Sequence, residues 1–89
     1  KSGELVMNSI EEQTKQVMEN LKAVLAEAGM SFDNVVKATI FITDMNDFSK
    51  INSVYGTYFS EKNAPARETV QVSRLPKDVN VEVSVIAVM

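Results

Sequence analysis

The stretch that decides the fold is Val35-Val36-Lys37-Ala38-Thr39-Ile40-Phe41-Ile42-Thr43. It is rich in β-branched residues and nearly all apolar after Lys37, which is typical of a strand in the interior of a sheet. The run Asp44-Met45-Asn46-Asp47 closes this strand and supplies side chains that can cap a following helix. We therefore predict a central strand over residues 35–43 and place the other elements around it.

A long amphipathic helix precedes this strand. Ser9 and Glu12 have the spacing of a capping box, and Gly29 stands where a left-handed C-terminal cap is favoured. Apolar or small residues recur in steps of four and three, at Ile10, Thr14, Val17, Leu21, Val24 and Ala28. The pattern predicts a helix from Ile10 to Ala28 whose stripe packs in the core.

A second helix follows the strand. Phe48, Ile51, Tyr55 and either Tyr58 or Phe59 mark one apolar face of residues 47–59. The two tyrosines are interpreted as packing aromatics with solvated hydroxyls. A glycine at position 56 weakens such a helix by roughly 1 kcal/mol relative to alanine.

Two more strands complete the chain. Residues 68–72 alternate in polarity, and Leu75-Pro76-Lys77-Asp78 is a turn whose charges are interpreted as solvated. In residues 79–86 valines alternate with polar side chains, which predicts a strand buried on at least one face.

These elements predict an α+β fold, a mixed sheet with two helices packed on one face. The 89 residues fit one domain, and a domain this small buries only about 60–65% of its unfolded surface, which favours association with other copies. Lys1–Met7 has the pattern of the end of a hairpin whose partner strands are missing from the sequence. We therefore expect a single domain over residues 1–89 that is incomplete at its N-terminal side.

The composition excludes several kinds of site. Cysteine and histidine are absent, which removes thiol nucleophiles, Ser–His–Asp triads and the commonest metal ligands, so no metal or cofactor is predicted. The net charge is −3 with no basic stripe, which disfavours nucleic-acid binding. No apolar run approaches the roughly 18 residues that span a bilayer, so no membrane association is expected and the cytoplasm is the expected compartment.

Several blocks, in order along the chain, resemble the RidA (YjgF) family of imine and enamine deaminases. They are Glu11–Val17 with Asn20–Leu25, Val35–Phe41 with Asp44–Phe48, Asn52-x-x-Tyr55 with Tyr58-Phe59, Pro65-Ala66-Arg67, Arg74-Leu75-Pro76-Lys77-Asp78 and Val81-Glu82-Val83. The resemblance implies a chorismate-mutase-like α+β fold that assembles as a homotrimer with sites at the subunit interfaces. It also implies a hydrolase that converts reactive 2-enamine and 2-imino acids, such as 2-aminoacrylate, into 2-keto acids and ammonia.

The same resemblance assigns roles to four residues. Arg67 corresponds to the clamp for the substrate carboxylate and Glu82 to the catalytic acid/base, while Thr69 and Asn52 correspond to substrate-binding positions. The chemistry of the residues agrees, because a planar guanidinium binds a carboxylate bidentately and a carboxyl group can activate water and deliver a proton. An acid among valines, as at position 82, is costly unless it is paired or used.

Each of these residues also has a structural interpretation. Arg67 is compatible with a surface ion pair, Glu82 with the exposed face of an edge strand, Asn52 with a solvent-facing helix position and Thr69 with an ordinary β-former. The chain also departs from the family. Nothing matches the Tyr and the Ser-Gly segment of the family's first strands, Glu68 replaces a frequent Ser, and Ser84 replaces a second acid.

Two other functions stay open at this point. Some relatives are described as endoribonucleases or translation inhibitors, although the chain has neither a basic channel nor a histidine for RNA cleavage. A non-catalytic trimeric sensor would use the same Arg67 pocket without turnover.

Overall fold

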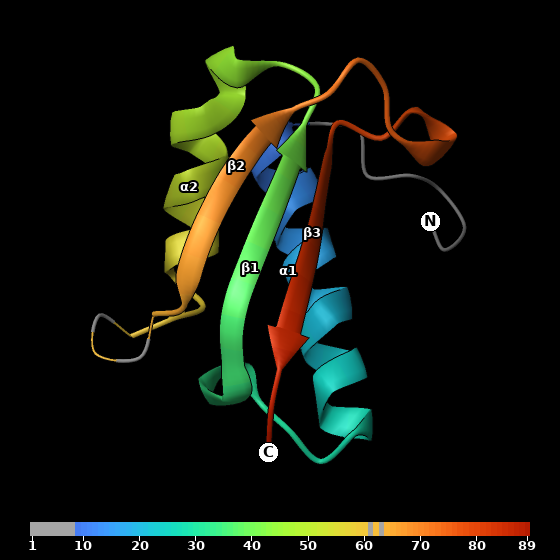
Figure 1. Cartoon of the computed structure of the whole chain (residues 1–89). Helices are drawn as coiled ribbons and strands as arrows, with labels where there is room; N and C mark the ends of the chain where they lie inside the picture. Colours follow the sequence, from blue (N-terminus) through green and yellow to red (C-terminus); the bar gives the residue numbers. More distant parts are fainter. Residues whose placement is uncertain (1–8, 61, 63) are drawn as a thin grey trace.

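The computed structural model describes residues 9–60, 62 and 64–89, so the hairpin end expected at Lys1–Met7 lies outside the described part. In chain order the main elements are α1 (Ile10–Glu27), β1 (Val35–Ile42), α2 (Phe48–Gly56), β2 (Ala66–Gln71) and β3 (Val81–Ala87) (Figure 1). Short 3-10 helices at Phe32–Asn34, Met45–Asp47 and Pro76–Asp78 join them. No helix within the described ranges is both long and apolar enough to cross a bilayer.

The sheet has β1 at its centre. Its strand order is β2-β1-β3, with β2 parallel and β3 antiparallel to β1. Both helices lie behind the sheet in Figure 1 and cover the same face of it. The predicted α+β architecture, a mixed sheet with two helices on one face, is therefore confirmed.

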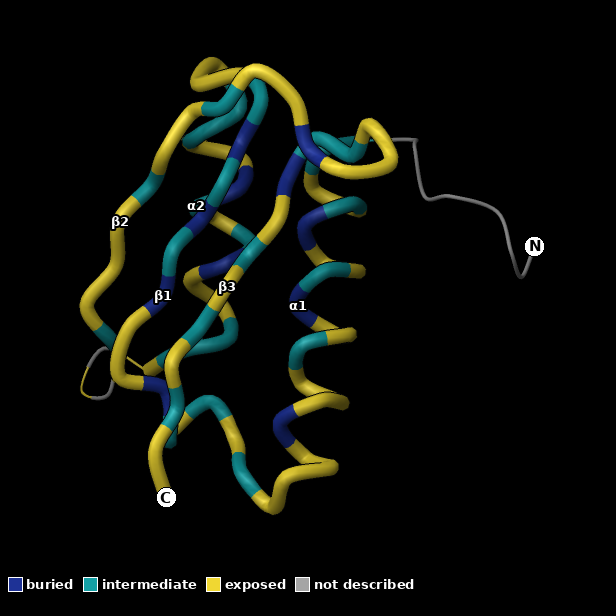
Figure 2. Tube along the Cα trace, turned by 45° about the vertical axis from the view of Figure 1, so that its right-hand side comes forward, coloured by how far each residue is buried: buried dark blue, intermediate teal, exposed yellow. Residues whose placement is uncertain are grey.

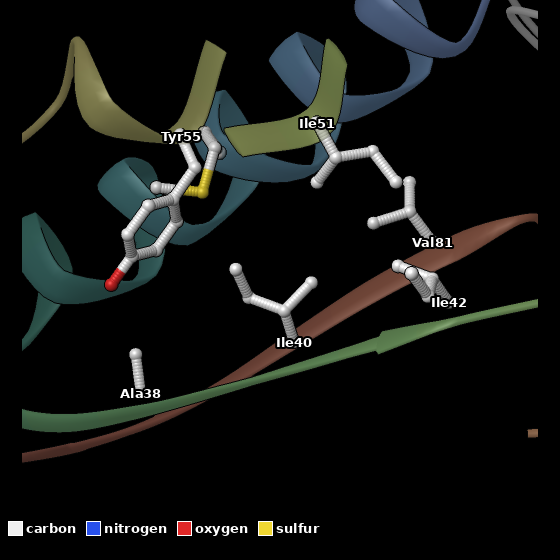
Figure 3. Packing of buried hydrophobic residues seen from close by; sticks show 7 residues of the cluster. Ala38, Ile40, Ile42, Ile51, Tyr55 and Val81 are labelled. Atoms are coloured by element: carbon white, nitrogen blue, oxygen red, sulfur yellow. The ribbon is translucent and has the colours of Figure 1, made fainter. Parts of the chain in front are cut away.

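The core lies between this face and the helices. From the sheet, Ala38, Ile40 and Ile42 of β1 and Val81 of β3 meet Met18, Ile51 and Tyr55 of the helices, and each is at most 5% exposed (Figure 3). Alternation along β1 explains the selection, because every second side chain of a strand points to the same face. Truncation of one such side chain to alanine typically costs about 2–5 kcal/mol, so this layer holds the two helices to the sheet.

The other face of the sheet is open. Thr39 and Phe41 of β1 point toward it, opposite Glu68 and Val70 of β2 and Ser84 and Glu82 of β3. Lys37 and Glu68 form an ion pair of 3.8 Å here, but both side chains are half exposed, so it contributes little to stability. Figure 2 shows that exposed positions alternate with half-buried ones along β3 after the buried Val81.

The boundaries of α1 agree with the prediction, and its core stripe agrees in part, because Thr14 is buried and Ile10 and Val17 pack against the core. Ser9 Oγ accepts from the Glu12 N–H at 3.0 Å, and Gly29 has a left-handed φ of 74°. The fully buried residues are Thr14, Met18 and Leu25, whereas the predicted core position Val24 is 63% exposed and Ala28 is also exposed. Val24 lies on the side of α1 that borders the outer edge of β3, which explains why it is not covered within the described residues.

The segments near α2 and β2 differ slightly from the prediction. The helix ends at Gly56 rather than continuing to Phe59, because the next residues form single turns. Strand β2 begins at Ala66, two residues earlier than expected, and its pairing with β1 places Arg67 inside the strand.

A hydrogen bond joins α1 to the turn that follows α2. The Tyr58 hydroxyl donates to Glu19 Oε2 at 2.7 Å. Burial, together with this bond and the charge of Glu19, raises the pKa of Tyr58 from 10.0 to about 12. The fold thus favours the neutral phenol, so the contribution to stability is complete below pH 10 and is lost as the pH rises through 12.

We expect Tyr58→Phe to lower the free energy of unfolding by about 1 kcal/mol at pH 8, the usual contribution of one hydrogen bond. The difference between the wild type and the variant should shrink between pH 10 and 12, because the ionised tyrosine no longer donates to Glu19. Urea unfolding at several pH values measures this difference. A difference that stayed constant to pH 12 would contradict the assigned hydrogen bond.

Candidate active site around Arg67

Arg67 lies on the helix-covered face of the sheet, at its β2 edge. It pairs with Ala38 of β1, and paired residues of neighbouring strands point to the same side. Ala38 is fully buried beneath the helices. Arg67 stays exposed because β2 is an edge strand, and its long side chain extends along α2.

Helix α2 holds the guanidinium group of Arg67. Arg67 Nη1 donates to Asn52 Oδ1, and the guanidinium carbon lies 5.8 Å from the Phe48 ring centroid and 5.3 Å from that of Tyr55. Phe48, Asn52 and Tyr55 are spaced i, i+4, i+7, so they form one stripe on α2. Aromatic rings attract a guanidinium electrostatically, and each such contact contributes about 0.5–1 kcal/mol at exposed sites.

A hollow of about 450 Å³ opens beside this group. Its lining residues are Asn52, Tyr55, Gly56, Phe59, Ser60, Ala64, Pro65 and Arg67. Among these described residues there is one cation and no carboxylate, and the aromatic ring of Phe59 and the ring of Pro65 supply an apolar wall. The arrangement suits a small ligand with an anionic end and a short apolar part.

The Tyr55 hydroxyl lies at the base of this region. Figure 3 shows it pointing toward the sheet near Ala38, the residue that pairs with Arg67. The hydroxyl is buried and has no hydrogen-bond partner among the described residues. Burial raises the pKa of Tyr55, an effect that the charge of Arg67 partly opposes, so the hydroxyl remains a neutral donor.

Thr69 shares the face of Arg67 but does not line the hollow. It pairs with Ile40 of β1, one pleat further along the strand. The structure therefore brings Arg67 and Asn52 together, whereas the substrate-binding role of Thr69 stays a prediction.

Glu82 lies on the opposite face of the sheet. It pairs with Phe41, a residue of the open face, and it borders a different hollow of about 360 Å³ between α1 and the outer edge of β3. Glu82 and Arg67 lie two strands apart across the sheet and are offset by three residues along β1. Their Cα atoms are therefore roughly 14 Å apart. One chain therefore does not bring the predicted clamp and the predicted acid/base into a common hollow.

The sequence interpretation missed the partners of Arg67. Tyr55 was interpreted as a packing aromatic with a solvated hydroxyl, which is wrong because that hydroxyl is buried, and Phe48 was interpreted only as part of an apolar face. The signal was available in the i, i+4, i+7 spacing of Phe48, Asn52 and Tyr55, an aromatic–amide–aromatic stripe facing an arginine. Within the described ranges, no three acidic side chains gather in an arrangement that could bind a metal ion.

Comparisons with known proteins extend this description. The profile of the family described as Endoribonuclease L-PSP matches residues 1–89. A RutC family protein of Pyrococcus horikoshii is 54% identical over 87 residues, which are 98% of this chain and 68% of the relative. The 2-iminobutanoate/2-iminopropanoate deaminase of Salmonella typhimurium is 45% identical, over 93% of this chain and 66% of the enzyme.

The fold is also similar to solved structures. TdcF of Escherichia coli, in a crystal structure with bound serine, superposes with a TM-score of 0.89 at 43% identity, over 99% of this chain and 71% of TdcF. The chain thus spans about two thirds of the length of these relatives. The match over all 89 residues and the agreement in fold lead to one conclusion: the chain belongs to the Endoribonuclease L-PSP family, which includes the RidA/YjgF proteins.

Proposed function

We propose that the protein hydrolyses reactive 2-imino and 2-enamine acids to 2-keto acids and ammonia. The observation that carries the proposal is the Arg67 guanidinium, fixed by α2 beside a hollow whose described lining has no carboxylate. A relative at 45% identity is named as a deaminase of 2-iminobutanoate and 2-iminopropanoate, and both of these substrates carry a carboxylate.

The ligand carboxylate would bind Arg67 from the side of the hollow. A guanidinium has five N–H donors, and the bond to Asn52 occupies one of them. The remaining donors can hold a carboxylate with two parallel hydrogen bonds. The apolar wall at Phe59 and Pro65 would then receive the short side chain of the substrate.

Hydrolysis of the imine needs one water molecule and a group that moves protons. Water adds to C2 of the imine while the nitrogen gains a proton, which gives a carbinolamine. The hydroxyl proton of the carbinolamine then passes to the amine nitrogen, the C–N bond breaks, and ammonia leaves with the electron pair of that bond while the 2-keto acid forms. An enamine first gains a proton at C3 and loses one from nitrogen, which gives the imine. Glu82 would carry these protons, since one carboxyl group can act as base and then as acid.

A second copy of the chain would supply Glu82. The carboxylate lies on the open face of the sheet, opposite to the face of Arg67, so the two would have to meet across an interface between copies of the chain. The open face offers apolar contact at Phe41, Val70 and Ile86, of which Val70 is 38% and Ile86 57% exposed. We propose a homotrimer, the assembly implied by the family resemblance, because a closed ring repeats the same pair of surfaces at each interface.

The proposal is tested with a coupled assay on the whole protein. A threonine dehydratase acting on threonine releases the 2-enamine acid, and the formation of 2-ketobutyrate is followed with and without the protein. Faster keto-acid formation supports the deaminase. Binding of 2-ketobutyrate without acceleration would favour a sensor, and RNA cleavage by the same preparation at physiological salt would favour the ribonuclease named in the family description.

A further inference from the structure

We propose that Asn52 is a positioning residue for Arg67, whose neutral side chain fixes the guanidinium and leaves its charge for the ligand. This inference rests on the proposed function, because it concerns how that site recognises a carboxylate. It differs from the role suggested by the sequence, in which Asn52 contacts the substrate directly.

The geometry shows how α2 immobilises the arginine. Phe48 and Tyr55 contact the guanidinium on either side of Asn52 along the helix stripe, and the Asn52 amide oxygen accepts from Nη1. The aromatic contacts restrain the guanidinium without using its N–H groups. The single bond to Asn52 fixes its rotation. An arginine ordered in advance loses less conformational entropy when the ligand binds.

The neutrality of the acceptor matters as much as its position. Aspartate has nearly the same shape as asparagine and would also accept from Nη1. Its negative charge, however, would pair with the guanidinium and compete with the ligand carboxylate. Position 52 can therefore order Arg67 with either residue, but only asparagine does so without cancelling the charge. The two functions of the residue can be separated by two substitutions.

Asn52→Ala removes the acceptor and retains the helix, since alanine has the highest helix propensity. We expect Arg67 to become mobile and the dissociation constant for 2-ketobutyrate to rise about 10-fold, the effect of one lost charge-assisted hydrogen bond. Asn52→Asp should keep Arg67 ordered and yet raise the dissociation constant about 100-fold, because an ionised neighbour now competes for the guanidinium.

Two measurements on the whole protein separate these effects. Heteronuclear NOE values of the Arg67 Nε–H report the order of the side chain, with Arg67→Lys used to assign the signal. Calorimetry with 2-ketobutyrate, the stable product of the proposed reaction, reports binding. Gln16→Ala is the matched control, because it removes a comparable amide bond, from Gln16 to Asn20 on the exposed face of α1, and should change neither quantity.

The expected pattern is a lowered NOE with weaker binding in Asn52→Ala, and an unchanged NOE with still weaker binding in Asn52→Asp. An ordered Arg67 with wild-type affinity in Asn52→Ala, or wild-type affinity in Asn52→Asp, would overturn the inference. If the wild-type protein binds no 2-ketobutyrate, the proposed function fails. In that case the NOE values alone decide whether Asn52 positions Arg67.

Discussion

Replacement of Arg67 with alanine should lower kcat/KM for the imine of 2-ketobutyrate by about 100- to 1,000-fold, because two charge-assisted hydrogen bonds contribute roughly 1.5–2 kcal/mol each. The fold should persist, since Arg67 is an exposed residue of an edge strand. The measurement is the coupled assay with threonine dehydratase, at several concentrations of the protein.

Two further variants make this result specific. Arg67→Lys keeps the charge but loses the planar fork and the stacking against Phe48 and Tyr55, so it should restore less than about a tenth of the lost activity. Arg74→Ala is the matched control, because Arg74 is exposed and bonds Asp78 within its own turn, at 2.5 Å from Nε. Equal losses in the variants of Arg67 and Arg74 would speak against a specific clamp.

Glu82→Gln should lower kcat by about 100- to 10,000-fold, the range typical of a lost general acid/base, with little change in the binding of 2-ketobutyrate. Glutamine keeps the size and the polarity of the side chain but does not take up a proton from water. Glu11→Gln, at an exposed position in the first turn of α1, provides the control for a lost carboxylate. An unchanged kcat in Glu82→Gln would assign the proton transfers to another group.

Because Arg67 and Glu82 lie on opposite faces of the sheet, the same two variants also test whether the site is shared between subunits. Arg67→Ala and Glu82→Gln should each be inactive alone, yet subunits of the two variants, mixed and reassembled in equal amounts, should regain activity. In a closed ring with sites shared between neighbours, about one quarter of the interfaces would combine an intact Arg67 with an intact Glu82. No recovery after verified subunit exchange would rule out a shared site.

Much of the fold follows from local patterns in the sequence. The β-branched run at residues 35–42, the Ser9 cap and the left-handed Gly29 are decided by neighbouring residues, and each was predicted within one residue. The core stripe of α1 was harder to predict from the sequence. Whether Val24 is covered depends on what lies beyond the outer edge of β3, and helix periodicity carries no information on that edge.

The candidate site, like the fold, was predicted from the sequence only in part. Arg67 and Asn52 were identified as site residues through the resemblance, and the structure places them in contact. Their relation to Glu82 was not predicted, because it depends on the registers of two strands that pair with β1 from opposite sides. A shift of either strand by one residue would reverse its faces, and alternation within the strand alone does not fix that choice.

The placement of Arg67 and Glu82 on the two faces of one sheet would make the proposed catalysis depend on protein concentration. Under this proposal, a lone chain would carry half of one site and half of another and no complete site. Mass action then links turnover to assembly: each dilution below the dissociation constant of the ring removes whole sites. On this arrangement, the amount of the protein in a cell would set the number of working sites and also the fraction of chains that belong to one.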